Sequence, residues 1–370
     1  MSKLGKILVA MSGGIDSTVA ALLLHEQGYE VIGVTMKTWD YQSSGTKNGK
    51  ETGCCSLDSL QDARSVAVKL GFHHFILDIR EEFGQSVIDN FVEEYLAGRT
   101  PNPCVMCNTH IKWNALLKRA NALDCEFIAT GHYARIKKLN QRYYISKAKD
   151  LNKDQSYVLW GLSQDSLARS MYPLAEFEKP EVRKMAYERG YESLSKKGES
   201  YEICFVPDND YRSFLKAKDQ DLEARVNQGL FLDQAGQVIG KHEGYPFYTI
   251  GQRKGLGQAF GKPMFVTDID SINNTVTLGE IHDLERKSLW IQKPNWMKYE
   301  TVIHKDELVT KVRYKDPGHV SSLSVDGDLL RVDFPYSVRG VAPGQSSVVY
   351  EADDIVCGGI IVKSEKLNPV

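Results

Sequence analysis

Two groups of residues in this sequence could carry chemistry, a glycine-rich segment near the N-terminus and a set of cysteines. The segment Ser12-Gly13-Gly14-Ile15-Asp16-Ser17 lies between an apolar run, Ile7 to Ala10, and an apolar helix-like stretch. Adjacent glycines let the backbone turn sharply and approach an anion, and the first amides of the following helix point at that anion. The segment therefore predicts a phosphate-binding loop. It is not a Walker A loop, because no Gly-Lys-Ser/Thr follows to place a lysine on the terminal phosphates.

The cysteines number seven, an odd number spread through a long chain, at positions 54, 55, 104, 107, 125, 204 and 357. This pattern favours catalysis or metal ligation over a disulfide framework. Cys104 and Cys107 lie in a proline-containing loop, Gly98 to Asn108, just before a helical segment from Ile111 to Leu123, where a thiolate is favoured. Cys125 and Cys357 are expected to be buried apolar residues. The adjacent pair Cys54-Cys55 is more typical of a loop with two packed thiols than of a redox-sensitive lid.

The overall composition limits the classes of protein to which this chain can belong. A length of 370 residues predicts two or three domains, and 42% hydrophobic with 25% charged residues is typical of a soluble globular chain. We expect a cytosolic protein, because the N-terminus leads directly into an apolar strand and no apolar run approaches a membrane span of about 20 residues. A net charge of −2 argues against a largely positive surface that would bind nucleic acid nonspecifically, although a local basic face is compatible with it.

The first half of the chain alternates short strand-like runs with amphipathic helical patterns. This predicts an α/β fold with a doubly wound parallel sheet, whose strands are Ile7 to Ala10, Val31 to Thr35, Phe75 to Ile79 and Phe127 to Ala129. Ligands of such sheets bind at the carboxyl ends of the strands. We therefore expect the loops Met11 to Ser17, Met36 to Trp39 and Thr130 to Tyr133 to converge. Residues 40–53 are expected to form either a mobile loop over the nucleotide or a plain surface loop.

Beyond about Phe205 the pattern changes to short alternating runs between turn residues. Hairpins are expected there at Gly229 to Gly240 and Met264 to Leu278, followed by an antiparallel β-barrel. A further hairpin, Arg135 to Ser146, is expected earlier, inserted after the fourth strand of the α/β region. The predicted domains are residues 1–204 for nucleotide binding and catalysis, 205–284 as a small central linking domain, and 285–370 as the C-terminal barrel.

The pattern S-G-G-x-D-S resembles the PP-loop of the ATP pyrophosphatases, which split ATP between its α- and β-phosphates and leave AMP on a substrate oxygen. That resemblance implies adenylation, after which nitrogen or sulfur can displace the oxygen. Further motifs along nearly the whole chain resemble the tRNA-specific 2-thiouridylase family, which places sulfur on C2 of the wobble uridine of tRNA. They include Gly98 to Asn108, Thr130-Gly131-His132-Tyr133-Ala134, Lys153-Asp154-Gln155, Ile203-Cys204-Phe205, Gly251 to Gly257, Val312-Arg313-Tyr314 and Pro343-Gly344-Gln345.

The resemblance implies roles for matching positions. ATP, with Mg²⁺, would be bound by Ala10, Met11, Ser12, Gly13, Gly14, Ile15, Asp16, Ser17, Met36 and Gly131. Cys107 matches the nucleophile, and Cys204 matches the cysteine that carries a persulfide. The target base would be lined by Asn102, Pro103 and Cys104. The tRNA would be touched by His132, Lys153, Asp154, Gln155, Arg313, Tyr314 and Gln345.

One departure from the family pattern concerns Cys104, which stands where most members have an aspartate available as a general acid or base. Cys104, Cys107 and Cys204 then match a subgroup thought to hold a 4Fe-4S cluster with one iron free to bind sulfide. In the alternative, the Cys204 persulfide attacks C2 and Cys107 closes a disulfide with Cys204. A zinc site that also uses His110 is allowed by spacing but is less favoured.

A tRNA substrate would have to present its uridine by base flipping, because C2 is inaccessible in a stacked anticodon loop. The basic segments Lys147 to Lys153, Arg253-Lys254 and Lys311 to Lys315 are the candidate phosphate contacts. The sulfur donor, a persulfide carrier protein or sulfide, is left open. Two alternative functions remain, a PP-loop amide-forming ligase that uses ammonia and a nucleotide-regulated RNA-binding protein without turnover.

Overall fold

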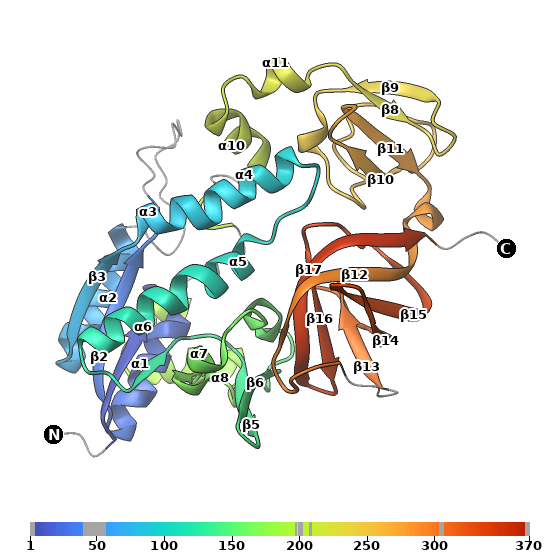
Figure 1. Cartoon of the computed structure of the whole chain (residues 1–370). Coiled ribbons are helices and arrows are strands. Elements are labelled where there is room, and N and C mark those ends of the chain that lie inside the picture. Colours follow the sequence, from blue (N-terminus) through green and yellow to red (C-terminus); the bar gives the residue numbers. More distant parts are fainter. Residues whose placement is uncertain are drawn as a thin grey trace. The chain divides into compact units, whose positions relative to one another are not determined.

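The computed structural model describes residues 4–39, 57–196, 198, 203–206, 209–302 and 307–366 (Figure 1). The chain separates into two compact units. The first unit comprises residues 1–87, 104–209 and 353–355, and the second comprises residues 88–103, 210–352 and 356–370. The segment Ile88–Pro103, which precedes Cys104 and Cys107, therefore groups with the C-terminal half of the chain. The predicted loop at 40–53 and the Cys54-Cys55 pair lie outside the described residues.

The first unit is built on a five-stranded parallel sheet. Its strand order is β3 (His73–Asp78), β2 (Glu30–Lys37), β1 (Lys6–Ala10), β4 (Phe127–Ala129) and β7 (Ser170–Met171). The four strands expected from the sequence are confirmed. Because β2, β1 and β4 are neighbours, their carboxyl ends, and the three loops predicted to converge, lie side by side at one edge of the sheet.

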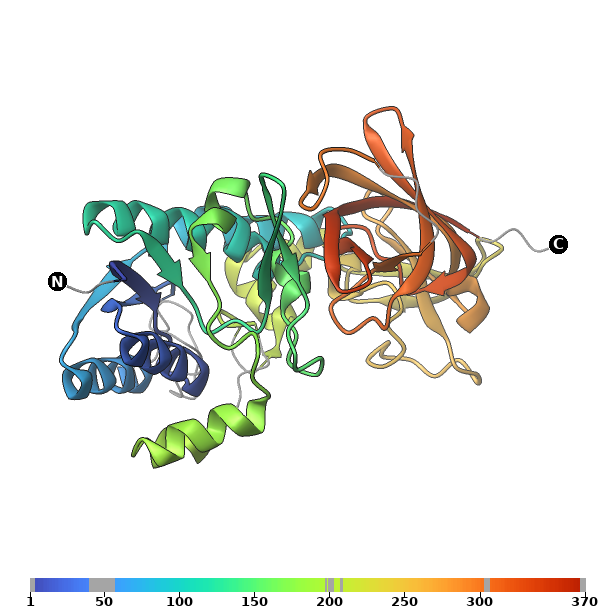
Figure 2. The ribbon, with the colours of Figure 1, turned by 90° about the horizontal axis from the view of Figure 1, so that it is seen from below.

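Helices cover both faces of this sheet, as Figure 2 shows. Ile7 and Val9 of β1 belong to one buried cluster with residues of α1 (Ile15–Gln27), α2 (Leu57–Leu70) and α8 (Lys179–Glu188). Successive strand side chains point to opposite faces, so Leu8 faces the other side, where α6 (Trp113–Ala122) contacts β1 and β4. All three strand residues are fully buried, which is typical of a parallel sheet in a doubly wound fold.

The cysteine pair 104 and 107 lies on a helix rather than in the predicted loop. Helix α5 (Pro103–Met106) begins at a proline, which suits a first helical position because its missing N–H has no partner there. It continues through a π-helical turn, η3 (Cys107–Lys112), into α6. The prediction that the loop extends to Asn108 was wrong by about one and a half turns.

The remaining elements of the first unit complete its surface. The expected hairpin is confirmed as β5 (Arg135–Leu139) and β6 (Arg142–Ser146), with Asn140 at a φ of +53° in the turn. The other helical elements are α3 (Arg80–Phe83), η2 (Gly84–Ile88), which leads into the second unit, η4 (Ser156–Leu159), α7 (Gln164–Ala168) and α9 (Glu192–Lys196).

The second unit contains a four-stranded sheet and a closed barrel. The sheet order is β10 (Phe265–Asp270), β11 (Thr275–Gly279), β8 (Gly229–Leu232) and β9 (Val238–His242), so both expected hairpins are confirmed. The barrel runs β12 (Glu285–Trp296), β15 (Leu329–Arg339), β14 (His319–Asp326), β13 (Leu308–Lys311), β16 (Ser346–Glu351) and β17 (Asp354–Lys366), and β17 pairs with β12 to close it. The helical elements are α4 (Asp89–Leu96), α10 (Tyr211–Lys218), α11 (Leu222–Val226), η6 (Tyr245–Phe247) and η7 (Ile281–Leu284).

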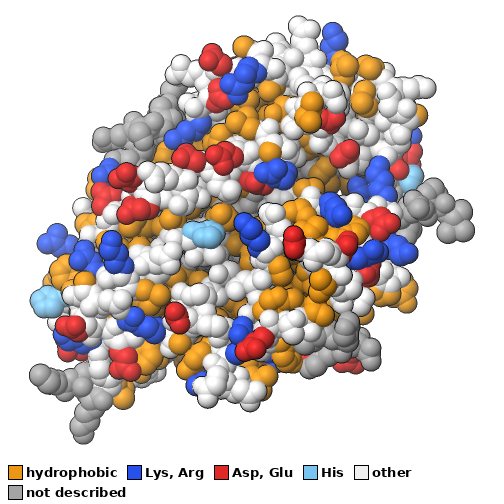
Figure 3. Space-filling view, viewed as in Figure 1, with side chains coloured by type: hydrophobic (Ala, Val, Ile, Leu, Met, Phe, Trp, Pro, Cys, Tyr) orange, Lys and Arg blue, Asp and Glu red, His pale blue; other side chains and the backbone are white. Residues whose placement is uncertain are grey.

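The surface mixes charges of both signs. On the face drawn in Figure 3, lysines and arginines alternate with acidic side chains and form no large patch of one sign. Among the helices of the described residues, none combines the length and the apolar character needed to cross a membrane. On the face that Figure 3 shows, no extended region of one sign is present to attract a polyanion from a distance.

Candidate active site

The loop between β1 and α1 is shaped by Gly13. Its φ is +68°, a left-handed conformation that other residues adopt only with strain, and a Cβ at this position would overlap the Ser59 carbonyl at the start of α2. Gly14 is the N-cap of α1 and has no side chain to bond the first helical amides. These amides are therefore left for an anion, which is the arrangement that a phosphate cradle needs.

Ser17 braces the same loop from inside. Its hydroxyl accepts a hydrogen bond from the Ser12 amide at 3.1 Å and donates one to the Gly14 carbonyl at 3.1 Å. The Ser12 hydroxyl lies 3.3 Å from the Ser17 hydroxyl. One hydroxyl thus joins both ends of the turn, so the loop keeps its shape through its own side chains.

Asp16 is held by Lys179, which sequence reasoning did not assign to the site, and by Tyr133 of a loop predicted to lie there. The ammonium of Lys179, a residue only 6% exposed, lies 2.7 Å from both Asp16 carboxylate oxygens, and the Tyr133 hydroxyl donates to Asp16 Oδ1 at 2.9 Å. Lys179 opens α8, and its amide donates to Asp150. Pro180 in the first turn marks a helix start in the sequence, but an ion pair that spans 163 residues leaves no local pattern. A buried cation therefore lies beside a phosphate loop that has no Walker lysine.

The loop after β4 contacts both the phosphate loop and the cysteine helix, which is the continuous helical segment from α5 through η3 to α6. Gly131 fits against α1 so closely that a Cβ would lie 2.6 Å from the Ser17 amide nitrogen. The His132 ring lies 5.7 Å from the Trp113 ring at the start of α6 and is hydrogen-bonded to Thr130 at 2.7 Å. Burial lowers the pKa of His132 to about 3, so the ring is neutral. This one loop links the candidate nucleotide and sulfur sites.

The end of β2 lies next to the phosphate loop through Thr35. The Thr35 hydroxyl donates to the Met11 carbonyl at 2.7 Å and therefore accepts from His74 Nε2 at 2.8 Å. Burial lowers the pKa of His74, which keeps this ring neutral as well. With the contacts of Gly131, the structure brings the loops after β1 and β4 together at the sheet edge, beside the end of β2.

The cysteines differ in their surroundings. Cys107 is buried at the first position of η3, Cys204 is half-buried and Cys104 is exposed, whereas Cys125 and Cys357 are buried, as expected of apolar core residues. None of these five described cysteines is in a disulfide. Although the Cys104 side chain keeps an exposed surface, the protein around its sulfur raises the pKa of the thiol, and Lys112 offsets part of this effect. Cys104 is thus a neutral thiol near neutral pH and cannot replace the aspartate as a general base.

The segments that carry Cys107 and Cys204 share one neighbour. The Phe205 ring lies 5.7 Å from the Phe83 ring of α3 in an edge-on arrangement, and α3 also contacts η3. The π-helical turn is seated by Asn108, whose amide donates to the Val158 carbonyl at 3.0 Å, and by Thr109, which presses against Gly161. Both thiols required for a persulfide relay therefore lie on segments packed against the same short helix.

The arrangement of the described thiols gives the predicted metal cluster no support. Within the described part of the chain, no three His, Cys, Asp or Glu side chains gather closely enough to hold a metal ion, and this includes Cys104, Cys107 and Cys204. His110 is exposed and belongs to no such group, so the zinc alternative gains no support.

Curated relatives cover the chain almost completely. A tRNA-specific 2-thiouridylase from Amoebophilus asiaticus is 60% identical over 365 residues, 98% of this chain and 97% of the relative. One from Cytophaga hutchinsonii is 59% identical over 99% of this chain and 100% of its own length. One from Clostridioides difficile is 44% identical over 97% and 98%. The chain belongs to the tRNA-specific 2-thiouridylase family.

Family models match in three consecutive blocks. They are described as a tRNA methyl transferase HUP domain over residues 5–208, a tRNA methyl transferase PRC-barrel domain over 216–280 and an aminomethyltransferase β-barrel domain over 286–361. The model descriptions name a methyl transfer, but the full-length relatives carry the thiouridylase name. Among solved structures, a 4-thiouridine synthetase–RNA complex with bound ATP aligns over 59% of this chain and 51% of its own, with 19% identity and a TM-score of 0.38.

In the first unit, the positions that match tRNA-contacting residues of the family partly serve the protein itself. Asp154 accepts hydrogen bonds from the Ala148 amide and from Ser156. Gln155 pairs with the Tyr133 backbone through both its side chain and its amide, at 3.1 and 2.8 Å. Together with the neutral, half-buried His132, these residues shape the loop beside the phosphate site. In the candidate basic segment, Lys147 and Lys149 are paired with Asp353 and Glu181.

In the second unit, the matching positions behave differently from one another. The Arg313 side chain is 55% exposed and lies 4.0 Å from Asp316, whose buried carboxylate accepts from the Gly318 amide. Tyr314, Arg253 and Lys254 are exposed too. The Gln345 amide instead donates to the carbonyls of Thr100 and Pro101. The family markers thus include both accessible cations and residues turned inward.

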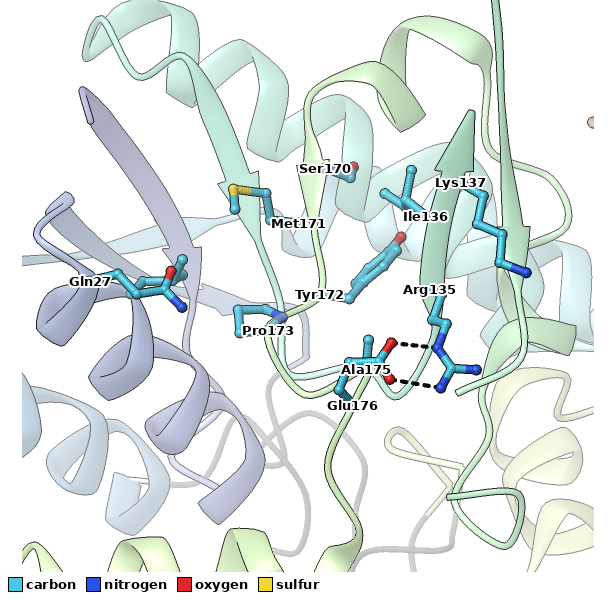
Figure 4. A pocket seen from close by; sticks show the side chains of 11 residues that line it. Gln27, Arg135, Ile136, Lys137, Ser170, Met171, Tyr172, Pro173, Ala175 and Glu176 are labelled. Carbon is cyan, nitrogen blue, oxygen red and sulfur yellow. Dashed lines mark hydrogen bonds and ion pairs between the residues drawn. The ribbon is translucent and has the colours of Figure 1, made fainter. Parts of the chain in front are cut away.

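A separate cleft of about 760 Å³ lies away from the phosphate loop. Its lining comes from the last turns of α1, from β5, and from β7 with the loop after it; Figure 4 shows the Arg135–Glu176 ion pair at its edge. α1 begins at the phosphate loop and has 13 residues, so its two ends are about 18 Å apart. No predicted site residue lines this cleft.

Proposed function

We propose that this member of the thiouridylase family uses ATP to adenylate the C2 oxygen of a wobble uridine in tRNA and then replaces that oxygen with sulfur from Cys204. The observation that carries this proposal is the continuous set of contacts from the phosphate loop, through Gly131 and His132, to the helix that bears Cys107. It supports activation and sulfur delivery at neighbouring positions on one sheet edge. The amide-forming ligase alternative would leave this thiol-bearing helix without a role.

ATP binding rests on the residues around the loop. The open amides at the start of α1 suit the phosphates, and the Lys179 ammonium supplies a positive charge that the loop itself lacks. Mg²⁺ would be held mainly by the ATP phosphates, since Asp16 is the loop's single carboxylate and already pairs with Lys179. When bound, Mg²⁺ supplies charge neutralisation for the departing pyrophosphate.

Sulfur transfer proceeds in two thiol-based steps. First, the outer sulfur of a Cys204 persulfide attacks C2 of the adenylated uridine, and AMP leaves with the former C2 oxygen. The product is a disulfide between Cys204 and the base. The Cys107 thiolate then attacks the Cys204 sulfur, which forms a Cys107–Cys204 disulfide and releases 2-thiouridine. An external dithiol must reduce this disulfide, and a persulfide donor must recharge Cys204, before the next turnover.

The tRNA is proposed to bind through a small set of local contacts. Accessible cations such as Arg313, Arg253 and Lys254 would meet backbone phosphates, while Asn102, Pro103 and Cys104 would line the flipped uridine. A tRNA substrate places the protein in a compartment that holds tRNA, and we propose the cytoplasm. We also propose the three-domain division at about residues 204 and 284, with both later domains serving tRNA.

The direct test is a thiolation assay with unmodified tRNA, ATP, Mg²⁺ and a persulfide donor. We expect 2-thiouridine in digested tRNA together with AMP and pyrophosphate, and no 2-thiouridine with Cys204→Ser. Protein purified without oxygen is assayed for iron and acid-labile sulfide in parallel. Activity that depends on iron, in the absence of a persulfide donor, would replace the persulfide route. A protein that binds tRNA without releasing pyrophosphate would overturn the assignment as an enzyme.

A further inference from the structure

Two segments of the second unit that are far apart in sequence lie against each other. One runs from Gly98 to Pro103 and leads into the cysteine helix, and the other is the β15–β16 turn, from Val341 to Gln345. Gln345 Nε2 donates to the Thr100 carbonyl at 3.1 Å and to the Pro101 carbonyl at 2.8 Å. The Thr100 amide donates back to the Pro343 carbonyl at 2.9 Å. The two segments are thus joined by three hydrogen bonds.

Gly344 allows this close approach. A Cβ at this position would lie 2.8 Å from the Thr100 carbonyl oxygen and 2.9 Å from a Glu94 carboxylate oxygen, and its φ is +89°. The turn is itself anchored in the barrel, because the Gly344 amide donates to the Ile361 carbonyl and the Ile361 amide donates to the Gln345 carbonyl. The barrel therefore presents Gln345 on a fixed support.

The chemistry of the segment explains why it needs a side-chain amide. Pro101 and Pro103 have no N–H, so between Thr100 and Pro103 the backbone offers carbonyls but few donors. A glutamine amide has two N–H donors, and Gln345 spends both on adjacent carbonyls. Only its carbonyl oxygen is left for any other partner. An RNA contact through the Gln345 N–H groups would have to break this arrangement.

We propose that Gln345 is a positioning residue for sulfur transfer. It fixes the backbone of Thr100 and Pro101, and through it the direction in which Asn102 and Pro103 continue along the chain into the helix of Cys104 and Cys107. This inference rests on the proposed function. The tRNA contact that the family resemblance implies at Gln345 would use the remaining carbonyl oxygen.

The test separates positioning from binding. Gln345→Met keeps the length of the side chain and removes both donors. We expect kcat for thiolation to fall by about 10- to 100-fold, because small misplacements of reacting groups have effects of this size. The dissociation constant for tRNA, measured by fluorescence anisotropy, should stay within about twofold of wild type, since phosphate contacts dominate affinity. Gln237→Met, an exposed glutamine in the β8–β9 turn, is the matched control and should change neither value.

A second readout does not depend on turnover. Hydrogen exchange of the Thr100 amide should speed up in Gln345→Met, because its bond to Pro343 loses the neighbouring support, while exchange in the barrel strands stays unchanged. Gly344→Ala should reproduce both effects by steric means. A weaker tRNA affinity with unchanged kcat would overturn the proposal, as would a variant that matches wild type in kcat and exchange. Wild-type protein that makes no 2-thiouridine would instead refute the proposed function. The exchange measurement would still show whether Gln345 holds the backbone at Thr100 in place.

Discussion

The phosphate loop and the cysteine helix are held in place by different means. The loop is over-determined, since Gly13 meets a neighbouring carbonyl, Ser17 bonds both ends of the turn, and Asp16 is held by Lys179 and Tyr133. The cysteines lie on a helix whose π-helical turn is held from outside, by Asn108 on Val158 and by Thr109 on Gly161. The nucleotide site thus depends on its own residues, whereas the thiols depend on their neighbours for direction.

The largest effect is expected where chemistry rather than shape is removed. Cys107→Ser should reduce 2-thiouridine formation by at least about 1,000-fold, because the hydroxyl cannot release the base-bound disulfide. Adenylation, followed as single-turnover pyrophosphate release, should persist. Cys125→Ser is the control, since this buried thiol makes only a weak contact with Leu123. Full activity of Cys107→Ser would show that the helix serves something other than sulfur transfer.

Gly13→Ala tests whether the phosphate loop tolerates any change of shape. The new Cβ would overlap the Ser59 carbonyl, so the loop must move, and kcat/KM for ATP should fall by about 100-fold. Gly28→Ala is matched for backbone strain, with a φ of +97° but open space around the Cβ. It should lose about 1 kcal/mol of stability and keep its activity. Equal behaviour of the two variants would mean that the steric contact has no functional weight.

Lys179→Met removes the buried cation beside the loop. We expect the KM for ATP to rise by about 10-fold and the stability to fall by about 1 to 3 kcal/mol, because Asp16 keeps its charge but loses its partner and is itself one-third exposed. Lys184→Met on the same helix removes an exposed pair with Glu188 and should change little. Urea denaturation and ATP kinetics together measure both effects. An unchanged KM would remove Lys179 from the nucleotide site.

The smallest effect is expected for His132, which lies in the loop that links the candidate nucleotide and sulfur sites. Burial lowers the pKa of His132 to about 3, whereas an unfolded histidine titrates near about 6.5. The unfolded chain therefore takes up a proton first, so His132's stability contribution is complete above about pH 6.5 and declines as the pH falls toward 3. His132→Asn should flatten the decline between about pH 7 and 5 in denaturation experiments. His282→Asn, an exposed histidine, should leave the slope as it is.

Local patterns were enough to predict the strands, the hairpins and the phosphate loop. Alternating apolar residues and glycine turns act over a few positions, and the structure follows them in β1 to β4 and in the barrel. Features that join distant positions could not be predicted. Lys179 reaches Asp16 across 163 residues, and Gln345 reaches Thr100 across 245. The segment 88–103 groups with the second unit although it lies in the sequence between β3 and β4 of the first unit's sheet.

The cysteine helix was misjudged for a related reason. Two prolines and two cysteines suggested a stiff loop, but Pro103 begins a helix because its ring already has helical φ. The widened turn at Cys107–Lys112 has no compositional sign, since it depends on the contacts of Asn108 and Thr109 with the segment around Val158 and Gly161.

That widened turn has a consequence for how the thiols are aimed. Each residue of a regular helix advances the rotation by about 100°, so one surplus residue turns everything before it by this angle relative to α6. Deleting a single residue between Asn108 and Lys112 would restore the regular i to i−4 backbone hydrogen bonds of an α-helix and would stabilise the helix itself. It would also swing the face that bears Cys104 and Cys107 by about a quarter of a circle. The π-helical turn therefore sets the direction in which the Cys104 and Cys107 side chains point.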